Sequence, residues 1–276
     1  MNEGLKAGII GYGGAFGMGK IHAEQLAAAG IPTAAVCDLD AGRLEQATVD
    51  FPEVRTYGQI EDLLKDPEVG LCVVILPHNL HAPVAIQCAR AKKHVIVEKP
   101  MCITVAEAGA MIEAARQAGV MLSVYHNRRW DGDYLAIRDL LARDVIGDAF
   151  HLEAAMGGYH APRDWWRSHK EISGGAMHDW GAHVIDWILN LIPEKVAGVD
   201  GYFHKRHWHG MTNEDHAELI IRFEGGKITV EDIGSLNGTY VNRQPRLMPG
   251  NPVELKSGDE IIIGKTFLKL VVDPVS

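Results

Sequence analysis

Five short apolar runs alternate with helical patterns over residues 1–125, and this alternation limits the fold more than any other feature of the sequence. The runs are LKAGIIG, TAAVCD, LCVVILP, HVIVE and MLSVYH, and the helical stretches between them are KIHAEQLAAAG, RLEQAT, APVAIQCARA and VAEAGAMIEAARQAG. The runs lack polar alternation, which indicates strands buried on both faces. Such strands, separated by helices, predict a doubly wound parallel sheet of the α/β class.

After residue 125 the pattern changes, and strands follow one another with few helices between them. A helix is expected at residues 134–142 and another within GAMHDWGAHVIDWILNLI, among the strand patterns AFHLEAAMGG, VAGVDGYFH, AELIIRF and KITVEDI. Consecutive strands predict an α+β domain with a mostly antiparallel sheet. From about residue 232, Gly, Pro and Asn separate short strands, which predicts β-hairpins. The expected parts are residues 1–125, 126–230 and 231–276.

Composition excludes several classes of protein. The 276 residues are 47% hydrophobic and 23% charged, which is typical of a soluble globular protein. A formal net charge of -9 argues against a general nucleic-acid binder, because such binding depends on lysine and arginine. No secretory leader and no membrane-spanning run is apparent, so we expect a cytoplasmic protein without a membrane partner.

A glycine-rich stretch follows the first predicted strand, in GIIGYGGAFGMGK. Glycine permits tight turns and leaves room for a phosphate, and the helix that follows offers free backbone amides to an anion. This predicts a dinucleotide pyrophosphate site at Gly11, Gly13, Gly14 and Gly19. The spacing is about three residues longer than G-x-G-x-x-G, so a simple flexible loop stays open as the alternative.

Asp38 ends the second apolar run, 19 residues after Gly19. An acid at this place accepts hydrogen bonds from the adenosine ribose and repels a 2′-phosphate, which favours NAD. The nearby Arg43 keeps NADP open, and a capping acid is the structural alternative for Asp38.

The run HVIVEKPMC places Glu98 and Lys99 at the carboxyl end of a buried strand, where open α/β sheets bind ligands. Pro77, Asn79 and His81 follow the preceding apolar strand in the same way. Together with the glycine-rich loop, these residues are candidates for cofactor binding. A lone surface lysine would be the alternative for Lys99.

In SGGAMHDWGAHVIDW, Asp179 and His183 stand at helical spacing i, i+4, and so share one helix face. A carboxylate beside an imidazole forms a natural acid/base pair, because histidine titrates near neutrality. A helix-packing cluster is the alternative. The histidines at 204, 207 and 209 lack partners that would complete a zinc site, and we expect no metal.

Residues 1 to about 230 resemble the glucose-fructose oxidoreductase / inositol dehydrogenase (Gfo/Idh/MocA) family. The motifs that carry the resemblance are the Gly-rich loop with His22, Asp38, Pro77 to His81, Glu98-Lys99-Pro100, Arg128 to Asp131, Trp166-Arg167, and Gly174-Gly175 through Asp179, His183 and Asp186. The resemblance implies a Rossmann domain, an NAD(P) cofactor, and oxidation of a secondary alcohol of a sugar or polyol.

The resemblance also implies roles for individual residues. His183 would be the general base, Lys99 would stabilise the developing alkoxide, and Asp179 would orient or share the proton. Expected substrate contacts are Tyr159, His160, Trp166 and Arg167. Two alternative functions stay open: an inactive dinucleotide-binding or phosphopeptide-binding module, and an NAD-dependent glycosidase of the same fold.

From about residue 216 the chain resembles the second half of a forkhead-associated (FHA) domain, on the segments SLNGTYVN and LKSGDEIIIG. The position three residues before His216 holds Asn213 where that family needs Ser, so a phosphothreonine peptide is not expected as a partner. The α+β substrate domain would then be truncated and followed by an FHA-like β tail. We expect reduced stability, and any homo-oligomer would form through the substrate-domain sheet.

Overall fold

The computed structural model describes residues 4–13, 16–147, 151–159, 161–224, 228–230, 239–248, 251, 253–255, 259–263 and 266–269. The chain divides into two compact units. The first comprises Met1–Leu140, Ala154–Asn190 and Phe203–Ala217, and the second comprises Leu141–Glu153, Leu191–Tyr202 and Glu218–Ser276. All candidate site residues lie in the sequence ranges of the first unit.

A six-stranded parallel sheet forms the centre of the first unit, in the order β3-β2-β1-β4-β5-β6. The doubly wound α/β fold predicted from the apolar runs is therefore confirmed. Its elements are β1 (Lys6–Ile10), α1 (Met18–Ala28), β2 (Thr33–Cys37), α2 (Ala41–Asp50), β3 (Arg55–Tyr57), α3 (Ile60–Lys65), β4 (Val69–Val74), η1 (His78–Leu80), α4 (His81–Arg90), β5 (His94–Glu98), α5 (Val105–Ala118) and β6 (Leu122–Tyr125).

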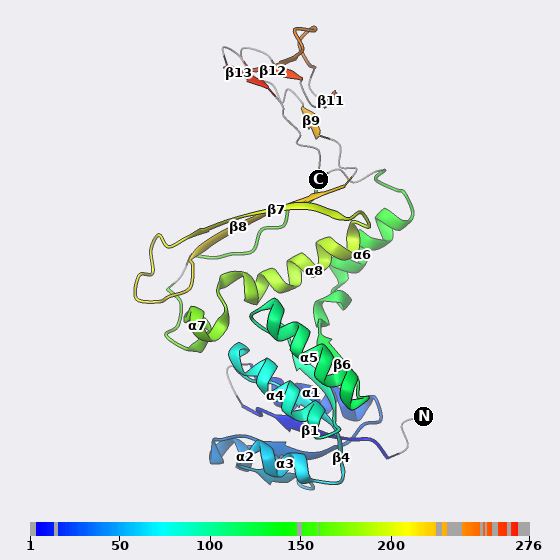
Figure 1. The fold of residues 1–276 in the computed structure, drawn as a ribbon, viewed down its shortest axis with the longest axis vertical. Helices are drawn as coiled ribbons and strands as arrows, with labels where there is room; N and C mark the ends of the chain where they lie inside the picture. The colour runs from blue at the N-terminus through cyan, green and yellow to red at the C-terminus, as the bar shows by residue number, and fades with distance from the viewer. Residues whose placement is uncertain are drawn as a thin grey trace. The chain divides into compact units, whose positions relative to one another are not determined.

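The hydrophobic core lies on both faces of this sheet, because successive residues of a strand point to opposite sides. Ala7 and Ile9 of β1 pack into a buried cluster with residues of α1 and α2. Ile10 belongs to a second cluster, which contains residues of α3, α4 and α5. Helices α4 and α5 pack against each other, as Figure 1 shows. Burial on both faces explains why the strands read as continuous apolar runs.

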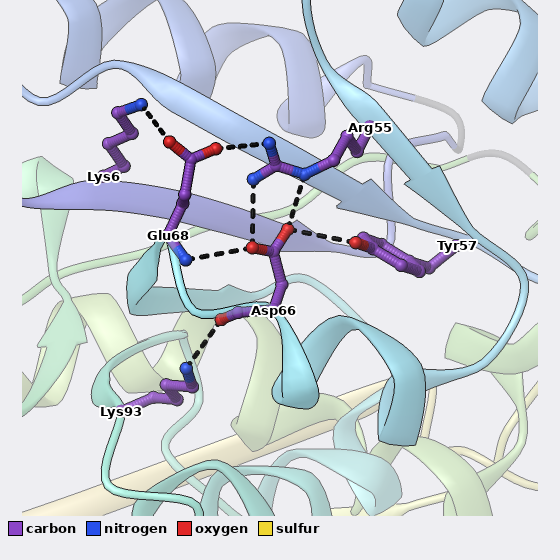
Figure 2. Close-up of polar contacts among 6 residues, drawn as sticks. All are labelled: Lys6, Arg55, Tyr57, Asp66, Glu68 and Lys93. Atoms are coloured by element: carbon purple, nitrogen blue, oxygen red, sulfur yellow. Dashed lines mark hydrogen bonds and ion pairs between the residues drawn. The ribbon is translucent and has the colours of Figure 1, made fainter.

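The edge strand β3 and helix α3 are elements that the sequence patterns did not predict. Strand β3 is short and polar, and a buried ion pair holds it at the amino edge of the sheet (Figure 2). The Asp66 carboxylate, 2% exposed, accepts hydrogen bonds from Arg55 at 2.7 and 3.0 Å and from the Tyr57 hydroxyl at 3.0 Å. Its Oδ1 also accepts from the Glu68 backbone amide, and Lys6 pairs with the Glu68 carboxylate.

The sequence ranges after the sheet contain helices joined by short turns, followed by a strand pair. They are η2 (Asn127–Trp130), α6 (Gly132–Ala142), η3 (Trp166–Ser168), α7 (Lys170–Ser173), a π-helical turn η4 (Met177–Gly181), α8 (Ala182–Leu191), β7 (Val196–His204) and β8 (His216–Phe223). Strands β7 and β8 pair with each other. Residues 151–159 form no strand, so the strand expected at residues 149–158 is wrong for its described part. The described residues of this stretch are mostly exposed.

The second unit contains short antiparallel strands, as the Gly/Pro/Asn punctuation predicted. They are β9 (Ile228–Val230), β10 (Thr239–Val241), β11 (Val253–Leu255), β12 (Glu260–Ile263) and β13 (Thr266–Lys269), in sheets ordered β10-β12-β13 and β11-β9. Of SLNGTYVN, residues 239–242 are described and 235–238 lie outside the described residues. Across the described ranges, no helix combines the length and apolar character needed to cross a bilayer.

Candidate active site

Lys99 stands at the centre of the candidate site, directly after β5. Its Nζ lies 2.7 Å from Oδ1 of Asp179 and donates a second hydrogen bond to the Asp179 backbone carbonyl at 3.3 Å. The same carboxylate oxygen accepts from Nη1 of Arg167 at 2.7 Å. The Lys99 side chain is only 13% exposed. A carboxylate thus joins two cations at the carboxyl edge of the sheet.

The helix that carries Asp179 is fixed at its start by polar contacts. Gly175 adopts φ 111°, and a Cβ there would lie 2.9 Å from Oε2 of Glu214. The Glu214 carboxylate accepts a hydrogen bond from the amide of Ala176 at 3.2 Å, which satisfies a backbone donor that the helix itself leaves free. The glycine is therefore needed for this close approach.

The π-helical turn η4 lies between Asp179 and the start of α8, and such turns occur often at functional sites. Asp179 and His183, predicted as a pair at i, i+4, are therefore not connected by a regular α-helical turn. The hydrogen bonds of the Asp179 carboxylate go to Lys99 and Arg167. His183 is buried and its Nδ1 has no hydrogen-bond partner. The two residues come from one helical segment, but the carboxylate holds the cations and leaves the imidazole free.

Four buried polar atoms near this ion pair have no hydrogen-bond partner: Nε2 of His78, Nδ1 of His126, Nε of Arg167 and Nδ1 of His183. His78 and His183 both sense the charge of Asp179, and His126 senses that of Lys99. Buried polar groups are normally hydrogen-bonded, so a cluster of unsatisfied ones indicates a place where a ligand or water binds.

Burial sets the protonation state of these imidazoles. It lowers the pKa of His183 to about 4, and the positive charges of Lys99 and Arg128 act in the same direction. Burial also lowers the pKa of His78 to about 3. Burial opposes ionisation of Asp179, but Lys99 and Arg167 outweigh it and hold its pKa below the usual value. At neutral pH the site therefore combines an ionised carboxylate with neutral imidazoles.

His78 and His81 were both part of the Pro77–His81 segment, but only His81 was predicted as a site residue. The structure places both ring nitrogens of His81 against backbone carbonyls, of Pro100 at 2.7 Å and Leu76 at 2.8 Å. His81 therefore joins this turn to the Lys99 segment. His78 donates from Nδ1 to the Ser173 carbonyl, which leaves Nε2 as a bare acceptor. Pro77 is half-buried and Asn79 is exposed.

The glycine-rich loop needs glycine where it packs closely against backbone. Gly11 has φ 91°, and a Cβ there would lie 2.0 Å from the carbonyl oxygen of Ile75. A Cβ on Gly19 would lie 2.4 Å from the Tyr12 carbonyl oxygen. Helix α1 begins without a side-chain cap and without an acidic residue in its first turn, so its amides are available to an anion. Gly14 lies outside the described residues.

Asp38 holds the glycine-rich loop from the end of β2. Its Oδ2 accepts from the amides of Tyr12 at 2.9 Å and Gly13 at 3.3 Å, and its Oδ1 accepts from the Asp40 amide. Arg43 lies 3.6 Å from the same carboxylate. The capping alternative is thus part of what Asp38 does, and the carboxylate still lies beside the loop where a ribose would bind.

Glu98 connects β5 to helix α1. Its Oε1 lies 2.7 Å from Nε2 of the buried His22, and its Oε2 accepts from the Lys99 backbone amide at 3.1 Å. Both oxygens thus have partners within the protein. Glu98 positions the lysine segment against the helix that follows the glycine-rich loop.

The predicted substrate residues separate into two groups. Trp166 packs edge-on against His78 and lies under the guanidinium of Arg167, so both belong to the site. Tyr159 packs instead against His207 and Trp208, away from the polar contacts around Asp179. His160 lies outside the described residues. Among the described residues, no group of three or more His, Cys, Asp or Glu could hold a metal ion.

Sequence reasoning missed His78, His126 and Trp180. His126 directly follows β6, as Lys99 follows β5, so the rule that selected Lys99 would also have selected His126. Trp180 lies within the helix signature but was passed over between Asp179 and His183. The unsatisfied ring nitrogens had no signal in the sequence.

A doubly wound sheet with a lysine–carboxylate pair at its carboxyl edge defines a dinucleotide-binding type of α/β protein. Residues 5–126 match the family described as "Oxidoreductase family, NAD-binding Rossmann fold", and residues 134–245 match the "GFO/IDH/MocA C-terminal domain". The chain belongs to the Gfo/Idh/MocA family. The second match includes residues 216–245, where we expected FHA-like sequence, and the FHA resemblance of the tail stays a prediction.

Several characterised proteins are similar to the chain. The scyllo-inositol 2-dehydrogenase (NADP(+)) IolW of Bacillus subtilis is 33% identical over 196 residues, which is 70% of this chain and 54% of that protein. The myo-inositol 2-dehydrogenase of Thermotoga maritima is 30% identical over 235 residues, 83% of this chain and 68% of that protein. The crystal structure of an NAD-binding protein from Listeria innocua superposes with TM-score 0.73 at 32% identity, over 81% of this chain and 64% of that one.

The chain spans about half the length of several curated relatives that it matches.

Proposed function

We propose that this protein is a nicotinamide-dependent dehydrogenase that oxidises a secondary alcohol of a sugar or polyol. One observation carries the proposal: the Lys99–Asp179 ion pair lies at the carboxyl edge of an NAD-binding sheet, beside a neutral, buried His183. The printed activities of two similar proteins, both inositol 2-dehydrogenases, support the substrate class.

The residues of the site divide the reaction between them. The hydroxyl proton of the substrate passes to a ring nitrogen of His183, which is neutral at physiological pH and can accept it. Lys99 donates a hydrogen bond to the substrate oxygen as negative charge develops there. The carbon–hydrogen bond breaks, its electron pair leaves as hydride, and a carbonyl forms. When bound, the nicotinamide of NAD(P)+ accepts that hydride.

Asp179 orients the side chain of Lys99. Its carboxylate accepts hydrogen bonds from Lys99 and Arg167 at 2.7 Å, which fixes the ammonium near His183. In this proposal Arg167 and Trp166 line the substrate side of the site. Tyr159 packs against Trp208, so its effect on the substrate would be indirect. The ionised carboxylate also offsets one of the two positive charges of Lys99 and Arg167.

The cofactor would bind along the glycine-rich loop. Gly11, Gly13 and Gly19 let the loop pack closely before α1, whose uncapped first amides would bind the pyrophosphate. Asp38 would accept from the adenosine ribose and favour NAD, while Arg43 allows some binding of a 2′-phosphate. The name of the Bacillus relative includes NADP(+), so the experiment measures both cofactors.

The test measures reduction of NAD+ and NADP+ at 340 nm with a panel of inositols, aldoses and alditols. We expect turnover with NAD+ and at least one ring polyol, and loss of turnover in Lys99→Met while NADH binding is kept. NADH binding without any turnover would favour the inactive dinucleotide-binding alternative. Cleavage of a nitrophenyl glycoside without net NADH formation would favour the glycosidase alternative.

We also propose that copies of the chain associate through the β7–β8 sheet. The supporting observation is that this two-stranded sheet carries exposed apolar side chains, Val196, Val199, Tyr202 and Ile220. Sedimentation velocity of the wild type and of Tyr202→Glu tests this, and an unchanged sedimentation coefficient would contradict it.

A further inference from the structure

Trp180 is a large aromatic side chain that is left 41% exposed within the candidate site. It follows Asp179 in the π-helical turn η4. Its ring meets the ring of His183 edge-on, with centroids 5.8 Å apart and planes at 62°. A tryptophan that served only for packing would bury its ring, because apolar surface left in water contributes no hydrophobic stabilisation.

The indole is held from one side by Arg128. The guanidinium lies 4.4 Å from the centroid of the Trp180 ring, which is a cation–π contact. Arg128 is itself fixed, because Nη1 donates to Asp131 at 2.7 Å and its carbonyl accepts from Nε1 of Trp187 at 3.0 Å. Trp187 in turn stacks on Tyr134. The orientation of Trp180 is therefore set before any ligand arrives, which lowers the entropy lost on binding.

We propose that Trp180 is a specificity-determining residue that stacks on the C–H face of a ring-shaped polyol while its reacting hydroxyl lies at His183. This inference rests on the proposed function and deepens it. The face of an aromatic ring is negative, so it attracts the weakly positive C–H groups of a saturated ring. A cyclic polyol presents several C–H bonds on one side, whereas an open-chain polyol adopts many conformers and pays more entropy to align them.

The experiment compares two probes with six carbons and six hydroxyls each, myo-inositol and sorbitol, in the wild type, Trp180→Leu and Trp180→Phe. We expect Trp180→Leu to raise KM for myo-inositol about tenfold with kcat within about twofold, since an aromatic contact contributes about that much. Sorbitol kinetics should change little. Trp180→Phe, which keeps an aromatic face, should restore most of the loss.

Trp130 supplies the matched control, because it is 77% exposed and lies in the neighbouring turn η2. Trp130→Leu should leave the kinetics of both polyols unchanged. A second measurement follows tryptophan fluorescence of the NADH-loaded protein during titration with myo-inositol. The polyol-dependent signal should decrease in Trp180→Phe, where Trp166 still reports binding, and stay unchanged in Trp130→Phe. Equal NADH affinity and circular dichroism across the variants exclude misfolding.

The outcomes separate this inference from the function on which it rests. If the wild type turns over myo-inositol and Trp180→Leu has the same KM, or loses myo-inositol and sorbitol equally, the role of Trp180 is wrong and the dehydrogenase remains. If the wild type neither turns over nor binds either polyol, the proposed substrate class fails, and the role of Trp180 fails with it.

Discussion

The same sheet carries an ion-pair cluster at each of its two edges, and the two clusters differ in how completely they are paired. At the amino edge, the buried Asp66 accepts from Arg55, Tyr57 and the Glu68 amide (Figure 2). At the carboxyl edge, the half-buried Asp179 accepts from Lys99 and Arg167. Each cluster thus places one carboxylate among basic side chains.

The difference lies in the neighbours. No side-chain atom of the Asp66 cluster is among the buried polar atoms without a partner in the described residues, whereas four such atoms belong to residues that interact with Lys99, Asp179 or their neighbours. The Asp66 cluster satisfies its own polar groups, which fits a role in holding the edge strand. Unsatisfied donors and acceptors reduce stability unless something else binds them, so the carboxyl edge is the candidate for ligand binding.

The largest expected effect comes from removing the lysine at the carboxyl edge. Lys99→Met keeps the length of the side chain but has no donor for the substrate oxygen, so kcat/KM should fall about 10²–10³-fold. Initial rates of NADH formation with the best polyol of the panel measure it. An activity within threefold of the wild type would refute the role given to Lys99.

The control for Lys99→Met is Lys93→Met at the opposite edge. Lys93 donates to the Asp66 backbone carbonyl, so it belongs to the structural cluster and not to the site (Figure 2). Its replacement should leave kcat/KM unchanged. A comparable loss in both variants would indicate a general effect of lysine removal on folding.

Asp66→Asn should produce the reverse pattern, a loss of stability without loss of cofactor binding. The substitution replaces one acceptor oxygen by an NH2 donor and removes the negative charge, so some of the donors from Arg55, Tyr57 and Glu68 lose their partner, which costs about 2 kcal/mol of unfolding free energy. Urea denaturation followed by circular dichroism measures this cost, and an NADH titration should give an unchanged Kd. Glu68→Gln, at a solvent-exposed carboxylate, should have a much smaller effect on stability.

The sequence predicted most of the sheet because burial on both faces leaves a clear apolar signal. Strands β1, β2, β4, β5 and β6 were recognised in this way. Strand β3 was not, since its residues are mostly exposed and it is held by Asp66 from outside the strand, a contact that has no local pattern. The strand expected at residues 149–158 fails for the converse reason: its residues alternate, but the described ones, 151–158, pair with no strand.

The site was predictable as far as chain position decides it. Lys99 follows a buried strand and Asp179 lies on a helix, and the structure brings these two together. The i, i+4 spacing also predicted that Asp179 and His183 form an acid/base pair on one helix face, and the structure shows that the hydrogen bonds of this carboxylate go to Lys99 and Arg167. A local repeat cannot reveal contacts with residues distant in the chain, and for the same reason the unpaired nitrogens of His78 and His126 went unnoticed.

In the cofactor-free protein, the contributions of the two edges to the unfolding free energy should change over different ranges of pH. His183 and His78 have pKa values lowered from 6.5 to about 4 and about 3, so the unfolded chain binds more protons than the folded one in this range. Unfolding free energy should therefore fall as pH decreases from about 6.5 to about 4.

Asp66 changes the unfolding free energy in the same direction, but only at a lower pH. Burial raises its pKa, but hydrogen bonds from Arg55 and the Glu68 amide outweigh burial and leave the pKa below 3.8. Its contribution is complete above pH 3.8 and is lost only below it. Urea titrations at stepwise pH measure the unfolding free energy as a function of pH. Between pH 6.5 and 4 this free energy should fall less steeply in His78→Gln than in the wild type, and equally steeply in Asp66→Asn. Equal slopes in all three proteins would contradict the assignment.

The smallest expected effect concerns a third ion pair, which also lies at the carboxyl edge but is looser. Arg43 lies 3.6 Å from Asp38 and extends over Gly13, where a Cβ would come within 2.1 Å of its side chain. The Arg43 side chain is 47% exposed and makes no close hydrogen bond to the buried Asp38 carboxylate, so the pair should contribute little to stability and the arginine can turn toward a 2′-phosphate. Arg43→Ala should weaken NADPH binding about two- to fivefold and leave NADH binding and urea stability unchanged. Fluorescence titrations with both cofactors measure the ratio; equal losses for NADH and NADPH would show that Arg43 supports the loop itself, as the amino-edge arginine supports β3.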